Sequence, residues 1–167
     1  MIILIEGADG SGKSTLVNQL NVRGYFTFSI DDKSKPSEEY RWKAIIASCE
    51  DNVAICDRCS FISDLVYRIC DGKPRRGIDL YKIASIMRND VAIVHCKTDS
   101  AFEDAMLRGE DNIVNSDSHN ELEKCYDMIL EMFRIFSGTD IFEYNWKKQN
   151  VSDVINFIEG RKLYAVR

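Results

Sequence analysis

The sequence predicts a three-layer α/β/α fold with a five-stranded parallel sheet. Short apolar runs rich in β-branched residues recur along the chain, and segments with helical spacing of apolar residues separate them. Strands that alternate with helices form parallel sheets that helices cover on both faces. The chain of 167 residues is long enough for one such domain. Because ligands of these sheets bind outside the carboxyl ends of the strands, we look for functional residues there.

Five segments have the character of buried strands. The first is a continuous apolar run that stops before Gly7, and the third stops at Asp57 and Arg58. A strand covered on both faces is apolar throughout, whereas a strand with one wet face alternates. The predicted strands are 1–5, 25–30, 53–56, 91–96 and 141–144.

Helices are predicted between and after these strands. In the first helix, Leu16, Val17 and Leu20 lie at helical spacing, and Gly24 separates the helix from the next strand. Ser37 is a suitable N-cap for the second helix. The predicted helices are 13–21, 37–50, 60–70, 79–88, 99–108, 119–136 and 151–159.

Two connections interrupt the regular alternation of strands and helices. Residues 71–77 (DGKPRRG) join two predicted helices with glycine, proline and three cations, and residues 109–118 (GEDNIVNSDS) form a polar segment between two others. For each, composition leaves two interpretations open: a mobile lid or substrate loop, and an ordinary solvated connection. Neither is long enough for a second domain, so we expect a single domain over 1–167 with a candidate lid at 109–118.

Composition narrows the class of protein. The chain is 45% hydrophobic and 29% charged, as is usual for a soluble enzyme, and its net charge of -5 argues against general binding of duplex DNA. Its apolar runs are too short to cross a bilayer and no basic segment precedes a signal-like stretch, so we expect a cytoplasmic protein. Cys56 and Cys59 form a C-x-x-C without a second ligand pair, which favours free thiols over zinc. The sequence leaves a homodimer open.

Residues 7–14 carry the strongest motif. Their sequence, GADGSGKS, satisfies G-x-x-x-x-G-K-[ST], follows a predicted strand and opens a predicted helix. In such a loop, backbone N–H groups and the helix N-terminus surround phosphate. We expect Lys13 to be exposed at the loop mouth and to reach the β- and γ-phosphates, and Ser14 to bind Mg²⁺. The predicted site for ATP and Mg²⁺ comprises Gly7, Asp9, Gly10, Ser11, Gly12, Lys13, Ser14 and Thr15.

Kinases, GTPases and motor ATPases share this loop, so other residues must distinguish them. The N-K-x-D motif with which GTPases read guanine does not occur, and residues 145–148 are NWKK. Motor ATPases usually have a longer chain and a strand that ends in adjacent acids, whereas here an acid, Asp57, precedes a base, Arg58. This pair suits Mg²⁺ together with an acceptor phosphate, which favours a kinase.

Two longer segments point to a particular kinase family. Residues 5–15 (IEGADGSGKST) are close to the E-G-x-D-G-x-G-K-[ST]-T of thymidylate kinases, and residues 57–68 (DRCSFISDLVYR) are similar to their D-R-Y-x-x-S-x-x-A-Y-Q. The RRG at 75–77 is similar to the family's R-G, and the RW at 41–42 to its R-W. The chain therefore resembles a small, divergent member of the thymidylate kinase and deoxynucleoside kinase family. This resemblance implies a P-loop nucleotide kinase fold.

The resemblance also implies roles for individual residues. Asp9 would face the acceptor sugar, and its presence favours the monophosphate-kinase branch, because deoxynucleoside kinases usually lack this acid. Arg58 would hold the acceptor phosphate and Asp57 would place Mg²⁺. In the family, lid arginines meet the transferring phosphoryl group, a role that here would fall to Arg108. The implied catalytic residues are Lys13, Asp57, Arg58 and Arg108, and the implied substrate-binding residues are Asp9, Arg41, Trp42, Arg58, Tyr67, Arg75 and Arg76.

These residues together predict an ATP- and Mg²⁺-dependent kinase of a nucleotide substrate. The expected acceptor is a deoxynucleoside monophosphate, dTMP or a related pyrimidine nucleotide. The sequence departs from the family at Arg68, which replaces a glutamine, and at 31–33, where DDK replaces R-E-P, so the base stays open. The alternatives are a deoxynucleoside kinase, a kinase of a modified nucleotide or of a nucleic-acid end, and a non-catalytic ATP-binding module.

Overall fold

The computed structural model describes residues 1–29, 53–70, 91–109 and 116–165. The predicted helices 37–50 and 79–88 lie outside these ranges. The described elements are β1 (Ile2–Glu6), α1 (Lys13–Val22), β2 (Phe26–Ser29), β3 (Ala54–Asp57), α3 (Ser60–Cys70), β4 (Val91–Cys96), α5 (Ala101–Leu107), α6 (Ser116–Ser137), β5 (Asp140–Tyr144) and α7 (Val151–Ala165).

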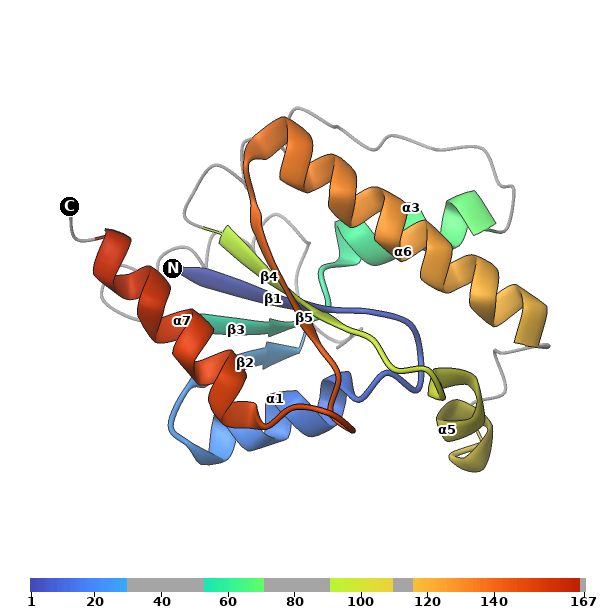
Figure 1. Ribbon diagram of the computed structural model, residues 1–167, viewed down its shortest axis with the longest axis horizontal. Coiled ribbons are helices and arrows are strands. Elements are labelled where there is room, and N and C mark those ends of the chain that lie inside the picture. Colours follow the sequence, from blue (N-terminus) through green and yellow to red (C-terminus); the bar gives the residue numbers. More distant parts are fainter. Residues whose placement is uncertain (30–52, 71–90, 110–115, 166–167) are drawn as a thin grey trace.

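The strands form a parallel sheet in the order β2-β3-β1-β4-β5. In its register, Leu4 of β1 is level with Cys56 of β3 and Ile93 of β4. Helices α1 and α7 pack on one face of this sheet, and α3 and α6 pack on the other (Figure 1). The predicted three-layer α/β/α fold is therefore confirmed, and the loops after β1, β3 and β4 lie at one edge of the sheet.

The central strand β1 shows why its sequence reads as one apolar run. Ile2 and Leu4 pack toward α3 and α6, whereas Ile3 and Ile5 pack toward α1 and α7. All four are buried, and removing such a side chain from water contributes about 1.5–3 kcal/mol. The strand ends in Glu6, which is also fully buried, so an acid lies in the interior beside the phosphate-binding loop.

Among the described helices, α1, α3 and α5 match the predicted bounds to within two residues, whereas α6 and α7 differ by three or more at one end. Helix α6 starts at Ser116, so 116–118 belong to a helix and not to the candidate lid at 109–118, of which 110–115 lie outside the described residues. Asp117 in its first turn favours this earlier start, because acids stabilise a helix N-terminus. Helix α7 continues past Gly160, since Val154 and Ile158 anchor it in the core. Among the described residues, no helix combines the length and apolar character that a membrane span requires.

Candidate active site

The phosphate-binding loop between β1 and α1 is closely surrounded by other elements. Gly10 and Gly12 have φ angles of 84° and 89°, which side chains rarely adopt. A Cβ atom on Gly10 would lie 1.8 Å from the carbonyl oxygen of Ala101, and one on Gly12 would lie 2.5 Å from the ring of Trp146. Glycine is therefore required at both positions, and α5 and the segment after β5 adjoin the loop.

Lys13 begins α1 and turns back into the loop. Its ammonium group donates a hydrogen bond to the Ala8 carbonyl oxygen at 2.5 Å and lies 3.9 Å from Asp9 Oδ1. The side chain is only 5% exposed, so the expectation of an exposed lysine at the loop mouth is wrong. Burial and the positive charge of Arg58 lower the pKa of Lys13 to about 8, whereas Asp9 opposes this shift. The loop oxygens thus replace water around the ammonium group.

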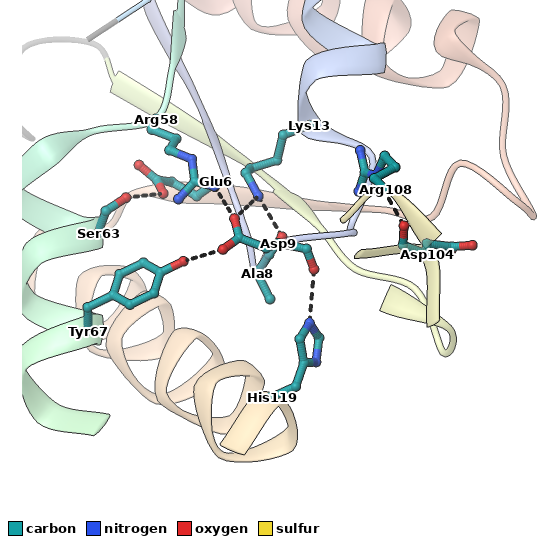
Figure 2. Close-up of polar contacts among 10 residues, drawn as sticks. All are labelled: Glu6, Ala8, Asp9, Lys13, Arg58, Ser63, Tyr67, Asp104, Arg108 and His119. Atoms are coloured by element: carbon teal, nitrogen blue, oxygen red, sulfur yellow. Dashed lines mark hydrogen bonds and ion pairs between the residues drawn. The ribbon is translucent and has the colours of Figure 1, made fainter. Parts of the chain in front are cut away.

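Asp9 is the centre of a polar cluster that joins the loop to β3 and α3 (Figure 2). Arg58 donates to Asp9 Oδ1, and the Tyr67 hydroxyl group donates to Oδ2 at 3.0 Å. Burial alone would raise the pKa of Asp9, but the charges of Arg58 and Lys13 outweigh it and lower the pKa. Burial and the nearby Asp9 carboxylate raise the pKa of Tyr67 to about 12. At neutral pH the cluster therefore holds a carboxylate between two cations and a neutral phenol.

Arg58 reaches this cluster from an unusual backbone conformation. Among the described residues it is the one non-glycine residue with positive φ, at 65°. It follows β3 directly, and its N–H group donates to the Ile5 carbonyl oxygen of β1 at 3.1 Å. A left-handed conformation is unfavourable for arginine, so the surrounding contacts must hold the turn.

Glu6 is one of those contacts. Its Oε1 accepts a hydrogen bond from the Cys59 N–H group, and its Oε2 lies 3.4 Å from the Ser63 hydroxyl donor. Burial raises the pKa of Glu6 to about 8, although the Cys59 hydrogen bond, Lys13 and Arg58 act in the opposite direction. The sequence motif assigned no role to this acid. Its signal was an ionisable residue at the end of an otherwise apolar buried strand.

His119 of α6 approaches the loop from below in Figure 2. Its Nε2 lies 2.9 Å from the Asp9 carbonyl oxygen, and its ring meets Phe102 of α5 edge-on at 6.0 Å between centroids. Because a carbonyl oxygen only accepts, Nε2 carries the proton in this contact. His119 is buried, and sequence reasoning missed it because no motif links it to a loop so distant along the chain.

The segment after β5 supplies an aromatic side chain to the loop. The ring of Trp146 adjoins Gly12, is 41% exposed, and has the Lys147 ammonium group 5.0 Å from its centroid. Lys147 in turn forms an ion pair of 2.9 Å with Asp104 of α5. Sequence reasoning used 145–148 only to argue against a GTPase and missed the contact of Trp146 with the loop.

The two predicted metal ligands lie at the same edge of the sheet. Asp57 ends β3 level with Ile5 of β1, and Ser14 is exposed in the first turn of α1. A carboxylate and a hydroxyl group are hard oxygen donors, which is the ligand chemistry that Mg²⁺ prefers. The residues present therefore fit a magnesium ion bound beside the loop. Ser11 is buried within the loop, and Thr15 is exposed next to Ser14.

Arg108 lies apart from the Asp9 cluster. It follows α5 directly, is exposed, and donates from Nε to the Asp104 carbonyl oxygen at 3.1 Å. In Figure 2 its side chain turns toward Asp104 and not toward Lys13. Four other predicted substrate residues lie outside the described ranges, namely Arg41, Trp42, Arg75 and Arg76.

Comparisons with known proteins bear on the fold. No family model matches the sequence, and no curated protein matches it significantly. Similar solved structures include the YorR protein from Bacillus subtilis in complex with phosphorylated GDP, with a TM-score of 0.68, 20% identity, and coverage of 95% of this chain and 96% of that chain.

Two further structures are those of named kinases. Deoxyadenosine kinase from M. mycoides with bound dATP has a TM-score of 0.61 and 17% identity, and the match covers 96% of this chain and 98% of that chain. Thymidylate kinase from Candida albicans has a TM-score of 0.58 and 15% identity, and the match covers 96% of this chain and 92% of that chain. The chain therefore has the fold of the P-loop nucleotide kinases.

Proposed function

We propose that the protein is a kinase that transfers the γ-phosphoryl group of ATP to a deoxynucleoside monophosphate, dTMP or a related pyrimidine nucleotide. One observation carries this proposal: Asp9, Arg58 and Tyr67 form one polar cluster directly beside Lys13 of the phosphate-binding loop. A donor loop and a set of groups suited to a sugar phosphate thus adjoin each other. Phosphoryl transfer chiefly requires that two substrates be aligned and that spreading negative charge be neutralised.

The donor side of the site is the loop itself. Its backbone N–H groups and Lys13 are assigned to the ATP phosphates, and Ser14 and Asp57 to Mg²⁺, which would neutralise charge between the phosphates. The half-exposed ring of Trp146 beside Gly12 offers an aromatic surface on which the base of ATP can stack.

The acceptor side is assigned to the Asp9 cluster. The Asp9 carboxylate can accept a hydrogen bond from a sugar hydroxyl group, and the Arg58 guanidinium group can hold a phosphate with two parallel hydrogen bonds. Tyr67 limits the space beside Asp9 from the α3 side. Arg41, Trp42, Arg75 and Arg76 are proposed to complete this side of the site on the strength of the sequence resemblance.

The transferring group needs a further cation. Members of the family that the sequence resembles can carry a basic residue in the loop where this chain has Gly10, so this loop offers no second cation there. We assign this role to Arg108, which directly precedes the segment that the sequence suggested as a lid and that ends where α6 begins at Ser116. Its exposed side chain donates to the Asp104 carbonyl oxygen, so it would have to turn toward the loop to meet the transferring group.

The pairing of Arg58 with Asp9 favours a second candidate function. A phosphate monoester must compete with the Asp9 carboxylate for the guanidinium group, whereas an uncharged nucleoside would leave that ion pair intact. In a deoxynucleoside kinase of this kind, Asp57 would serve as the base for the 5′-hydroxyl group or as a metal ligand.

A coupled assay of ADP release tests these assignments. The acceptors are deoxynucleosides, deoxynucleoside monophosphates and a 5′-hydroxyl oligonucleotide, each with saturating ATP and Mg²⁺. Turnover with monophosphates alone supports the proposal, and turnover with nucleosides alone supports the second candidate. Turnover with the oligonucleotide alone, or ATP binding without turnover on any acceptor, contradicts both.

A further inference from the structure

Glu6 is ionisable, whereas the other four residues of β1 are apolar, yet it is as deeply buried as they are. It lies on the face of the sheet that Ile2 and Leu4 present to α3 and α6, and it is fully buried. A carboxyl group in such a place loses its hydration, so it needs hydrogen-bond partners from the protein. Its partners come from one short stretch of chain, the turn that joins β3 to α3 and the first turn of α3.

That turn is attached to β1 through two successive backbone N–H groups. The N–H of Arg58 donates to the Ile5 carbonyl oxygen at 3.1 Å, and the N–H of Cys59 donates to Glu6 Oε1. The hydroxyl group of Ser63, in the first turn of α3, adds a contact of 3.4 Å to Oε2. A backbone carbonyl and a side-chain carboxyl group of the same strand therefore fix the turn from its two sides.

The turn determines where Arg58 points. With φ at 65°, Arg58 leaves the direction of β3 and its guanidinium group reaches Asp9 of the phosphate-binding loop. Tyr67, farther along α3, reaches the other oxygen of the same carboxylate. If the Cys59 N–H group lost its acceptor, the left-handed conformation of Arg58 would lose one of its restraints. The side chains of Arg58 and Tyr67 would then no longer be held in a fixed position relative to β1.

We propose that Glu6 is a positioning residue, whose buried carboxyl group holds the Arg58–Cys59 turn against β1 and so presets the guanidinium group of Arg58 at the acceptor side of the loop. The positioning of Arg58 by Glu6 does not depend on the activity of the protein, whereas its consequence for catalysis rests on the proposed function. Glu6 contacts no substrate itself, and it influences the acceptor side of the site by positioning Arg58.

The contacts of Glu6 also explain why an apolar residue is absent from this end of β1. An alanine or leucine would leave the Cys59 N–H group buried without an acceptor, which is costly. A glutamine would keep one carbonyl oxygen for that N–H group and would nearly preserve the shape. Glu6→Gln therefore removes the ionisable group but keeps an acceptor for the Cys59 N–H group, whereas Glu6→Ala removes both.

The structural half of the proposal is tested without any substrate. Amide hydrogen exchange is measured by NMR for the Cys59 N–H group, with the Ala54 N–H group, which donates to Met1, as the internal reference. Glu6→Ala should speed exchange at Cys59 and not at Ala54, and Glu6→Gln should change it less. The exposed carboxylate variant Glu131→Gln is the matched control and should change neither. Unchanged exchange at Cys59 in Glu6→Ala overturns the proposal.

The catalytic half uses a double-mutant cycle with Arg58. For the acceptor that the ADP-release assay identifies, Glu6→Ala should lower kcat/KM by up to about 10²-fold, as misplacement of a binding group by 1 Å can. Glu6→Gln should lower it less, and the affinity for ATP should stay within about twofold of the parent. In an Arg58→Ala background, Glu6→Gln should cause no further loss, because it acts through the side chain already removed.

The two proposals can fail separately. If Arg58→Ala leaves every acceptor unaffected while exchange at Cys59 responds as expected, the acceptor role of Arg58 is wrong and the positioning of the turn stands. If Glu6→Gln and Arg58→Ala lower kcat/KM additively, Glu6 acts by another route and the positioning proposal is overturned. If Glu6→Ala does not fold, as circular dichroism would show, Glu6→Gln and the Arg58 background still decide the outcome.

Discussion

The two sides of the phosphate-binding loop hold their charges in different ways. On the side of β3 and α3, the Arg58–Asp9 ion pair is mostly buried, with 22% and 15% of the two side chains exposed. On the side of α5 and the segment after β5, the Lys148–Asp99 pair leaves 65% and 83% exposed. Water and salt screen the second pair far more than the first. A buried pair thus presets one side of the site, whereas on the other side the Lys148–Asp99 pair can rearrange at little cost and the Lys147–Asp104 pair, 38% and 21% exposed, is intermediate.

Because of this difference in burial, substitutions on the two sides of the loop should affect catalysis and stability in different proportions. A side chain on the open side can be essential for the transition state and contribute almost nothing to folding. A side chain on the buried side contributes to both.

Arg108 belongs to the open side and should show the largest catalytic effect. An arginine that meets the transferring phosphoryl group is worth about 10³–10⁵ in turnover, so Arg108→Ala should lower kcat by about that factor. ATP affinity and thermal stability should hardly change, because the interaction forms mainly in the transition state. Arg108→Lys should recover only part of the rate, since a point charge does not replace the planar guanidinium group.

The measurement is steady-state turnover, with ATP binding followed by titration calorimetry. If kcat of Arg108→Ala stays within a few-fold of the parent, Arg108 has no role at the transferring group. A cation from 71–77, Arg75 or Arg76, would then be tested in its place.

Lys13 lies on the buried side and combines both effects. Lys13→Ala should lower kcat by about 10²–10³, the usual cost of losing one electrostatic group at a reacting centre. It should also shift the thermal midpoint, because the Ala8 carbonyl oxygen and Asp9 lose the ammonium group that they surround. Circular dichroism checks that the variant still folds. Retention of most of the turnover would contradict the assignment of the loop.

Asp9 should affect the acceptor more than the donor. Asp9→Asn removes the negative charge that attracts Arg58, and it replaces one of the two oxygens that accept hydrogen bonds from Arg58 and Tyr67 with an NH₂ group. Because a hydrogen bond to a charged group is worth about 1.5–3 kcal/mol, kcat/KM for the acceptor should fall about 10- to 100-fold. Fluorescence or calorimetric titrations of both ligands provide the comparison. Equal losses of acceptor and ATP affinity would refute an acceptor role for this carboxylate.

Glu6 gives the buried side a pH-dependent contribution to stability. Burial raises the pKa of the Glu6 carboxyl group to about 8. The charges of Lys13 and Arg58, which face this group, act in the opposite direction but are outweighed. Tyr126 and Cys96 also lie within electrostatic reach of it. The unfolded chain has a pKa near the ordinary 4.5, so it loses the proton first as pH rises. Stability is therefore full below about pH 4.5 and falls through pH 8, by at most about 1.4 kcal/mol per pH unit.

The variant Glu6→Gln lacks this titration and should lose less stability between pH 5 and 8 than the parent. Urea unfolding at a series of pH values measures the difference in the free energy of unfolding. Parallel curves for the two proteins would show that Glu6 is ionised in the folded state at all these pH values.

The sequence was sufficient for the fold and for part of the site. Strands such as β1 and β4 are buried on both faces, so their position follows from apolar runs without knowledge of the partner strands. The resemblance assigned both Asp9 and Arg58 to the acceptor, and the structure brings the two side chains into contact beyond the neighbouring strands β1 and β3. Glu6 and His119 were missed because their roles depend on which distant N–H or carbonyl group lies opposite them. No spacing rule encodes contacts across 53 or 110 positions.

The burial of Lys13 could not be predicted for a similar reason. The motif specifies a lysine within the loop, but the conformation of the lysine side chain depends on whether water or the loop's own oxygens surround its ammonium group. Here the Ala8 carbonyl oxygen and Asp9 lie close enough to surround the ammonium group, so the side chain folds back. The local sequence therefore predicts that an ammonium group is present in the loop, but it does not predict how far water reaches that group.

The smallest effect is expected for the Lys148–Asp99 pair. Lys148→Ala removes a contact of 2.7 Å, but both side chains are mostly in water, where such pairs contribute little and are screened by salt. The thermal midpoint should stay within measurement error of the parent, at low and at high salt. The matched change on the buried side, Arg58→Ala, should lower the midpoint clearly, because it leaves the mostly buried Asp9 carboxylate without its guanidinium partner. If Lys148→Ala instead lowers the midpoint by as much as Arg58→Ala, this pair holds the segment after β5 against the segment between β4 and α5, and the open side of the loop is as rigid as the buried side.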